Sequence, residues 1–372
     1  MKKSKPIVSI IFGTRPEAIK MAPVIKSFEE YKKINIRVII TGQHREMVNQ
    51  VMELFNLEVD KDLNIMKKNQ SLSYITKKVL EGLEEEFQKY KPSLVLVQGD
   101  TSTAFTAALG AFYSRIPIGH IEAGLRTNSL NDPFPEEGNR RLISQIASLH
   151  FAPTKQSQSN LINSNVNGSI YVTGNTVIDS LLMISNKTQM TKYSGINWKQ
   201  NKIIFVSVHR RENWGERLDN IICGIKLILE KHKDVVIFLP MHPNLIVRNP
   251  LMNSFKNNPR VFLNEPLNYI DLVDTINSCY LLLTDSGGLQ EEAPSLGKPV
   301  LILRETTERP EALEAGTAKL IGTTPIKILE ETTQLLLNKK IYNNMSNATN
   351  PFGDGKASAR ILKECKKYLN LN

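Results

Sequence analysis

The sequence predicts an α/β protein made of two doubly wound domains, each a parallel sheet with helices on both faces. Three observations favour this fold class. Short runs rich in β-branched residues and leucine alternate with longer amphipathic segments along the whole chain, as in parallel sheets with crossover helices. These runs are almost continuously apolar, which is typical of strands covered on both faces. The length of 372 residues suits two α/β domains of ordinary size.

The strand pattern occurs in eight segments: Val8–Phe12, Ile36–Thr41, Leu94–Gln98, Ile116–Ile121, Ile203–Val208, Val235–Pro240, Tyr280–Thr284 and Pro299–Leu303. Helical periodicity occurs between them in Met21–Tyr31, Leu72–Tyr90, Leu142–Ile146, Leu218–Glu230 and Ile326–Leu337. One set of elements ends near Val172, and a second begins after the polar connector Ser185–Lys202. We therefore expect domains at 1–172 and 173–355, with a ligand-binding cleft between them.

Composition places the chain among globular proteins, with 41% hydrophobic and 23% charged residues. No run of about eighteen apolar residues occurs, so no membrane span is expected. The basic start, Met1–Pro6, leads through a short apolar run into Gly13–Pro16, which is typical of a functional turn and not of a cleavage site. Cys223, Cys279 and Cys365 are far apart and lack metal-ligand spacing. These features indicate a cytoplasmic protein without a metal site.

The net charge of +10 favours an anionic partner. Lysine pairs such as Lys77–Lys78 and Lys366–Lys367 are scattered among acidic residues, with no basic stripe interleaved with aromatics. We therefore expect a small anionic ligand and no nucleic acid.

The run Thr284–Glu292 is the strongest local signal, because it joins a strand to a helix start through Ser286, Gly287 and Gly288. Backbone N–H groups at such a helix start can bind phosphate oxygens. Glycines let the backbone approach a ligand closely. Glu292 could then accept hydrogen bonds from sugar hydroxyls. Simple helix capping would favour similar residues.

Polar residues also follow most other predicted strands. In the first half these runs are Gly13–Lys20 (with Arg15 and Lys20), Gly99–Thr103 (with Asp100), Glu122–Arg126, and Pro133–Arg140 (with Glu136 and Arg140). In the second half they are His209–Asn213, Met241–Pro243 and Arg304–Glu311. Each residue alone is compatible with a structural role. Their coincidence at strand ends indicates acid/base chemistry on an anionic, hydroxyl-rich ligand. A diphosphate-linked sugar fits, whereas the first loop is not the Gly-x-Gly-x-x-Gly of nicotinamide-binding proteins, so no cofactor is expected.

Motifs along nearly the whole chain resemble those of the non-hydrolysing UDP-N-acetylglucosamine 2-epimerases. The matching segments are Gly13–Pro23, Gly42–Met47, Gly119–Arg126, Pro135–Arg140, Thr173–Asp179, Val208–Asn213, Asp285–Pro299, Glu308–Glu311 and Asn350–Gly355. The resemblance implies a two-domain fold of the GT-B glycosyltransferase type, a C-terminal helix at 356–372 that packs on the N-terminal domain, and a homodimer. It also implies epimerisation at carbon 2 of the sugar, by elimination and re-addition of UDP through a 2-acetamidoglucal, without metal or nicotinamide.

The same resemblance implies residue roles. Asp100, Glu122, Glu136 and His209 would be catalytic. Substrate-binding roles would fall to Arg15, Lys20, Arg140, Leu272, Ser286, Gly287, Gly288, Glu292 and Arg309. A second, activating UDP-sugar site would involve Gln43, Glu46, Gln70, Arg210 and His242. The chain departs from the family pattern at Glu46, where activated relatives tend to have glutamine, and at Leu272, where an aromatic residue often lies near the uracil.

Three alternatives stay open at this point. A relative acting on a modified sugar, such as a 6-deoxy or uronic-acid UDP-N-acetylhexosamine, would carry the same motifs. A glycosyltransferase of similar fold would share the UDP site but would not exchange the carbon-2 hydrogen. A non-enzymatic UDP-sugar sensor would not need Asp100, Glu122 and Glu136.

Overall fold

The computed structural model describes residues 5–43, 45–67, 69–127, 129–131, 133–186, 195–198 and 200–371. The basic start Met1–Ser4, His44 of the Gly42–Met47 motif and half of the Ser185–Lys202 connector (187–194 and 199) lie outside these ranges. The chain divides into two compact units, residues 1–180 with 352–372 and residues 181–351. The boundaries predicted from the sequence are 172/173 and 355/356. The first unit extends further because the start of helix α7 (Thr176–Ser185) bonds to it, through Ser180 Oγ and the carbonyl of Ile19.

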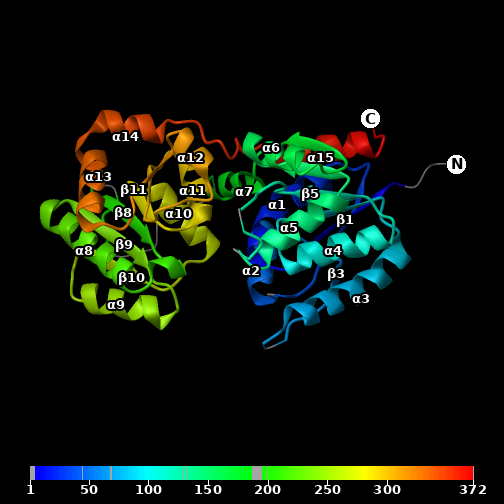
Figure 1. The fold of residues 1–372 in the computed structure, drawn as a ribbon, viewed down its shortest axis with the longest axis horizontal. Helices are drawn as coiled ribbons and strands as arrows, with labels where there is room; N and C mark the ends of the chain where they lie inside the picture. The colour runs from blue at the N-terminus through cyan, green and yellow to red at the C-terminus, as the bar shows by residue number, and fades with distance from the viewer. Residues whose placement is uncertain are drawn as a thin grey trace. The chain divides into compact units, whose positions relative to one another are not determined.

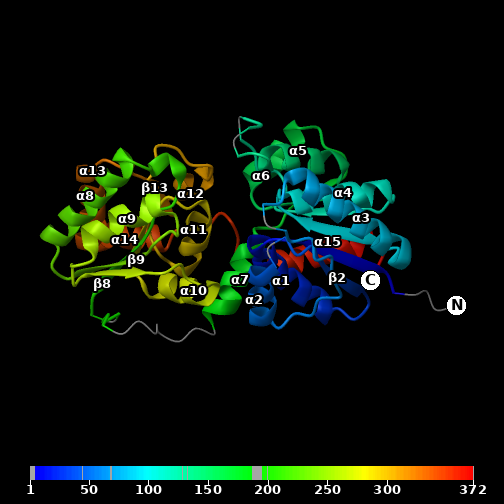
Figure 2. The same cartoon turned by 90° about the horizontal axis from the view of Figure 1, so that it is seen from below.

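The first unit contains a parallel sheet of seven strands within the described residues, in the order β3-β2-β1-β4-β5-β6-β7. Figure 2 shows helices on both faces of this sheet, with α3, α4 and α5 on one side and α1, α2 and α15 on the other. The elements are β1 (Ile7–Phe12), α1 (Arg15–Glu30), β2 (Asn35–Ile40), α2 (Arg45–Phe55), β3 (Lys61–Asp62), α3 (Leu72–Tyr90), β4 (Leu94–Gln98), α4 (Ser102–Tyr113), β5 (Ile118–Ile121), α5 (Glu136–Ile146), β6 (Leu149–Ala152), α6 (Lys155–Asn163), β7 (Ser169–Val172), the start of α7, and α15 (Ala357–Tyr368).

The second unit contains a parallel sheet of six strands in the part of the chain described, in the order β10-β9-β8-β11-β12-β13. Figure 1 labels β8, β9, β10 and β11 of this sheet. Its elements are β8 (Lys202–Ser207), the short 3-10 helix η1 (Arg211–Asn213), α8 (Glu216–Lys231), β9 (Val235–Pro240), α9 (Leu245–Phe255), β10 (Val261–Asn264), α10 (Tyr269–Ser278), β11 (Leu281–Thr284), α11 (Gly287–Glu292), the 3-10 helix η2 (Ala293–Leu296), β12 (Val300–Ile302), α12 (Pro310–Glu314), β13 (Ala318–Leu320), α13 (Pro325–Leu337) and α14 (Lys339–Ser346).

The central strands of each sheet are buried on both faces, as their apolar sequences predict. In the first unit, Ile11, Val95 and Val97 pack with Val79 and Leu83 of α3. In the second, the strands pack against α8, α9 and α13. In both sheets the strand order reverses beside the first strand of the unit, and loops after the carboxyl ends of neighbouring strands meet at that edge. The described ranges hold no helix with both the length and the apolar character needed to cross a bilayer.

Candidate active site

Asp100 and Glu122 lie at the carboxyl edge of the first sheet, directly after β4 and β5. Glu122 is buried and adopts a left-handed backbone with φ 61°, an uncommon conformation for a residue with a side chain. Its carboxylate accepts hydrogen bonds from Lys20 Nζ at 2.6 and 2.7 Å, Gln98 Nε2 at 2.5 Å and Asn175 Nδ2 at 2.8 Å. Donors from α1, from β4 and from the loop before α7 therefore hold this carboxylate in one orientation.

Asp100 faces a different partner. Arg140 donates to its Oδ2 through Nε at 2.9 Å and through Nη2. Burial raises the pKa of Asp100, Arg140 opposes that rise, and the negative charge of Glu122 adds to it. Asp100 is therefore a carboxyl group that can exchange a proton closer to neutral pH than an ordinary aspartate.

Arg140 is itself held by Glu137, a fully buried residue in the first turn of α5. Glu137 Oε2 accepts from Arg140 Nη1 at 3.1 Å and from the backbone N of Thr127 at 3.0 Å. Glu136 lies beside it, and its carboxylate has no hydrogen-bond or ion-pair partner among the described residues. The structure therefore brings Asp100, Glu122, Lys20 and Arg140 together, and places Glu136 outside that network.

Glu17 ties the loop before α1 to the loop that carries Asp100. Its carboxylate accepts from the backbone N of Gly13 and Thr14 and from Thr101 Oγ at 2.6 Å. A Cβ at Gly13 would lie 2.1 Å from Thr41 Oγ1, so only glycine fits this close approach. Burial raises the pKa of Glu17. The half-buried Arg15 lies at the start of α1, beside this junction.

In the second unit, the buried carboxylate of Asp285 organises the loop after β8. It accepts from the backbone N of His209 and Arg210, at 3.0 and 2.9 Å, and from Asn213 Nδ2 at 3.0 Å. His209 Nδ1 lies 3.2 Å from Asp285 Oδ1. Burial lowers the pKa of His209, and Asp285 opposes that shift. The contact favours the tautomer with the proton on Nδ1, which leaves Nε2 as a hydrogen-bond acceptor.

The predicted phosphate loop begins α11, with Ser286 as its N-cap. The space over Gly287 is open, because an added Cβ would meet nothing closer than Arg210 Nη2 at 3.5 Å. Arg210 also lies 3.5 Å from Glu308. Arg309 pairs with Glu291 through its Nε, and Glu292 is buried at the end of α11. Arg210 is thus the guanidinium that the structure places over the glycines.

A small pocket of about 170 Å³ opens beside the same strand ends, after β8 and β9. His209, His242 and Leu272 line it together with Met241, Pro266 and Leu267. The two imidazole rings stack, with centroids 6.2 Å apart and planes 18° apart. The pocket walls are largely apolar, which suits a flat heterocycle.

The positions predicted for a second ligand lie in two places. Gln43 and Gln70 are in contact in the first unit, where Gln70 Nε2 donates to the carbonyl of Gln43 at 3.2 Å and Gln43 Oε1 accepts from Thr103 Oγ at 2.8 Å. Glu46 is exposed in the first turn of α2. Arg210 and His242 belong to the second unit.

Asn175, Gln98, Glu17 and Asp285 were not among the site residues predicted from the sequence. Asp285 and Gln98 stand at strand ends, where position alone could have marked them. Asn175 contacts a carboxylate 53 residues away, and sequence reveals no such contact.

The fold and these residues define a two-domain α/β protein. It has an acid network at the carboxyl edge of the first sheet and a glycine-rich loop at the carboxyl edge of the second sheet. The family model for UDP-N-acetylglucosamine 2-epimerase matches residues 26–366. The UDP-N-acetylglucosamine 2-epimerase of Bacillus subtilis is 49% identical over 368 residues, covering 98% of this chain and 95% of that protein.

Solved structures agree. The UDP-GlcNAc 2-epimerase of Neisseria meningitidis, solved bound to UDP-GlcNAc, is 46% identical with a TM-score of 0.88, covering 97% of this chain and 100% of that one. S. aureus MnaA, solved with UDP, is 41% identical with a TM-score of 0.88, covering 99% and 98%. The chain belongs to the UDP-N-acetylglucosamine 2-epimerase family.

Proposed function

We propose that this protein interconverts UDP-N-acetylglucosamine and UDP-N-acetylmannosamine. Removal of the proton from carbon 2 and cleavage of the bond from carbon 1 to the UDP oxygen give 2-acetamidoglucal and UDP. UDP then adds back to carbon 1, and a proton adds to carbon 2 on the opposite face. The observation that carries the proposal is the pair Asp100 and Glu122, one half-buried and one buried carboxyl group at one sheet edge with different partners.

We assign proton transfer to Asp100. Its raised pKa makes this carboxylate a stronger base than an ordinary aspartate, which favours removal of the proton from carbon 2. Glu122 is the fixed anion of the pair, because Lys20, Gln98 and Asn175 all donate to it. Its charge raises the pKa of Asp100, while Arg140 keeps that carboxyl able to ionise. Glu136, with no partner among the described residues, is available to interact with the sugar.

The UDP portion would bind the second unit. Ser286, Gly287 and Gly288 would present backbone N–H groups to the diphosphate, and Arg210 would neutralise it from above the glycines. The apolar pocket with Leu272 would take the uracil, and Glu292 would accept from the ribose hydroxyls. His209 would interact with the leaving phosphate or the sugar.

Arg15 and Arg309 have supporting roles in this scheme. Arg15 stands beside the loop junction that Glu17 fixes, where it would contact phosphate. Arg309 pairs with Glu291 in α11 and would hold the phosphate-binding helix in place. Gln43, Glu46, Gln70, Arg210 and His242 stay candidates for a second, activating UDP-sugar.

The functional test uses purified protein and UDP-N-acetylglucosamine, with proton NMR to follow the anomeric signals. The proposal predicts a new UDP-N-acetylmannosamine signal and trace 2-acetamidoglucal with free UDP. A panel of 6-deoxy and uronic-acid UDP-N-acetylhexosamines run in parallel defines the substrate. Turnover of a panel member with none of the parent sugar would assign the chain to the modified-sugar alternative.

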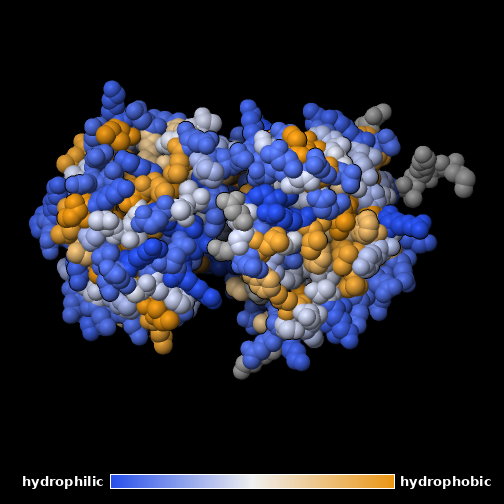
Figure 3. All heavy atoms as spheres, in the orientation of Figure 1, coloured by the Kyte–Doolittle hydropathy of each residue, from blue (hydrophilic) through white to orange (hydrophobic). Residues whose placement is uncertain are grey.

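We also propose that the protein acts as a homodimer, and the helical face α3–α4–α5 of the first unit is the candidate interface. Figure 3 shows apolar side chains gathered over these helices. Phe112, Tyr113 and Leu142 expose 52, 67 and 53% of their surface. Monomeric proteins rarely leave such large aromatic groups clustered in water.

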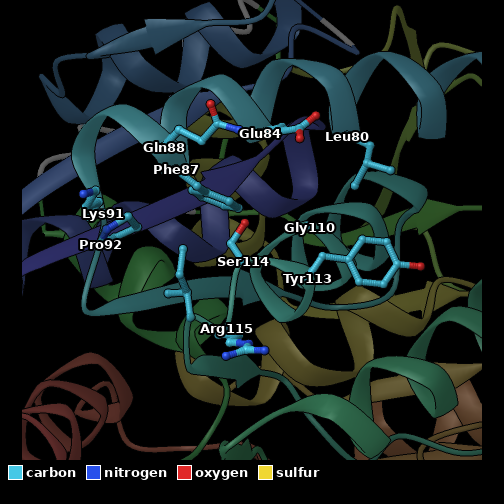
Figure 4. A pocket seen from close by; sticks show the side chains of 11 residues that line it. Leu80, Glu84, Phe87, Gln88, Lys91, Pro92, Gly110, Tyr113, Ser114 and Arg115 are labelled. Carbon is cyan, nitrogen blue, oxygen red and sulfur yellow. The ribbon is translucent and has the colours of Figure 1, made fainter.

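A pocket of about 660 Å³ indents this face (Figure 4). It lies between α3 and the end of α4, with Glu84 on one helix and Arg115 just after the other. Within the described ranges, neither of these two side chains has an ion-pair partner. An apolar centre flanked by one acid and one base is self-complementary about a two-fold axis, so a second copy of the chain is the occupant that fits.

The cellular location follows from other observations. Cys223, Cys279 and Cys365 are all free thiols, which suits a reducing compartment. We therefore place the protein in the cytoplasm.

A further inference from the structure

Asn175 connects the acid network to the point where the chain re-enters the first unit. Its side-chain Nδ2 donates to Glu122 Oε1 at 2.8 Å, and its own backbone N donates to the carbonyl of Phe352 at 2.6 Å. Only 2% of its surface is exposed. One buried residue thus contacts both a carboxylate assigned to the reaction and the returning chain.

The contact with the returning chain is close and has several parts. A Cβ on Gly174 would lie 3.2 Å from Gly353 Cα, and both glycines have positive φ, 89° and 142°. Arg360 Nη1 donates to the carbonyl of Thr173 at 2.9 Å. Asp179 Oδ1 accepts from Ser358 N at 2.8 Å. The segment 173–179 is therefore bound along its length to the segment 352–360.

The contact of Asn175 with Glu122 also has a defined geometry. Asn175 Oδ1 accepts from Val177 N at 3.2 Å, which orients the amide so that Nδ2 faces Glu122. Lys20 from α1 pairs with that carboxylate, Asp100 after β4 and His120 of β5 interact with it electrostatically, and Arg140 of α5 pairs with Asp100. Asn175 supplies the neutral donor among them.

We propose that Asn175 is a positioning residue for Glu122, and that it couples the orientation of this carboxylate to the Phe352–Gly353 segment. The inference rests on the proposed epimerase chemistry for its consequence, but not for its structural test. Loss of the amide removes one hydrogen-bond donor to Glu122 Oε1. The carboxylate can then rotate away from the sugar. A carboxylate at position 175 would also repel Glu122.

The test uses Asn175→Asp, which keeps the shape and the Oδ1 contact, and Asn175→Ala, which removes both. Carbon-13 NMR of labelled glutamate carboxyl groups, with Glu122→Gln to assign the signal, follows the titration of Glu122 in the intact protein. We expect the midpoint of that titration to move to higher pH by about one unit in both variants, and further in Asn175→Asp. We expect kcat to fall about tenfold or more while UDP affinity stays unchanged.

Two more variants keep the test decisive. Asn160→Asp introduces the same carboxylate at a half-buried asparagine whose Nδ2 donates to the carbonyl of Gly124 and not to Glu122, and should not move the titration. A Cβ at position 353 would meet the backbone of Asn175 but not Glu122. Gly353→Ala should therefore move the midpoint of the Glu122 titration in the same direction as Asn175→Ala does. An unmoved Glu122 titration in folded Asn175 variants overturns the inference, as does an equal shift in Asn160→Asp. Because the titration needs no turnover, a wild-type protein without epimerase activity would refute the proposed function and still decide the role of Asn175.

Discussion

Arg140 and Asp100 form a two-pronged contact, with Nε of the arginine 2.9 Å from Oδ2 of the aspartate and Nη2 donating to the same oxygen. Glu137 holds the other side of the guanidinium at 3.1 Å. The arginine is therefore fixed before any ligand binds, and its charge opposes the effect of burial on the Asp100 carboxyl. The balance between these two effects sets the pH at which Asp100 can accept a proton.

Replacing Arg140 by methionine should move the acidic limb of the kcat/KM profile to higher pH. Arg140 favours the anion of Asp100, so its loss raises the pKa of that carboxyl further, and the ionised base forms only at higher pH. We expect a shift of about one pH unit or more. Arg141→Met is the control, because Arg141 pairs with Glu137 and does not contact Asp100. An unchanged limb in Arg140→Met would remove Asp100 from the titration.

Gly287→Ala should weaken UDP binding without destabilising the protein. An added Cβ has room in the structure, and alanine is favoured over glycine in a helix by about 0.5–1 kcal/mol. The methyl group would occupy the space assigned to the diphosphate, so we expect UDP affinity to fall about tenfold or more. Calorimetric titration with UDP measures this. Gly138→Ala, also in open space, should bind UDP normally; equal affinity in both variants would mean that the diphosphate binds elsewhere.

Charge reversal on the α3–α4–α5 face should disrupt the dimer, and a second reversal should restore it. Glu84→Arg or Arg115→Glu alone would place like charges together if Glu84 of one copy meets Arg115 of the other. The double variant recreates an attractive pair. Light scattering across a dilution series reports the molecular mass, with the exposed Glu230→Arg as control. Wild-type protein that is monomeric at all concentrations, or single variants that dimerise normally, would contradict this interface.

Asp179→Ala should destabilise the first unit by about 2–3 kcal/mol. Its buried carboxylate accepts from Ala357 N, Ser358 N and Ser358 Oγ, and so caps α15 from a distant part of the chain. Urea denaturation followed by circular dichroism measures the loss. Asp354→Ala removes an exposed ion pair with Arg360 in the same region and should cost less than about 0.5 kcal/mol. Equal costs would mean that the cap contributes nothing beyond a surface contact.

The sequence predicted the two parallel sheets because their central strands are strongly apolar. The bounds of β4 and β9 and of helix α3 agree with the predicted segments. Helix α4 was missed because Ser102–Tyr113 is rich in alanine and buried along most of its length, so it shows little periodicity. For α5, only the last five residues carried the helical pattern, because its first turns hold the charged Glu136, Glu137 and Arg140.

Candidate site residues could be predicted where they directly follow a strand, but their long-range contacts could not. Position after a strand marked Asp100, Glu122 and His209 as candidates, and the sheet topology brings the loops of Asp100 and Glu122 to one edge. Contacts that link distant segments carry no local signal. The bond of Asp285 to the loop at His209 spans 76 residues, and that of Asn139 to the carbonyl of Asp100 spans 39.

Solvent-hydrogen exchange at carbon 2 of the sugar tests the central claim most directly. UDP-N-acetylglucosamine incubated with the enzyme in deuterium oxide should gain deuterium at carbon 2, as mass spectrometry and proton NMR can measure. Asp100→Asn should slow this incorporation by about a thousandfold or more while binding UDP with wild-type affinity. Wild-type protein that binds UDP-N-acetylglucosamine without incorporating deuterium, or an Asp100→Asn variant that incorporates it at the wild-type rate, would contradict the account.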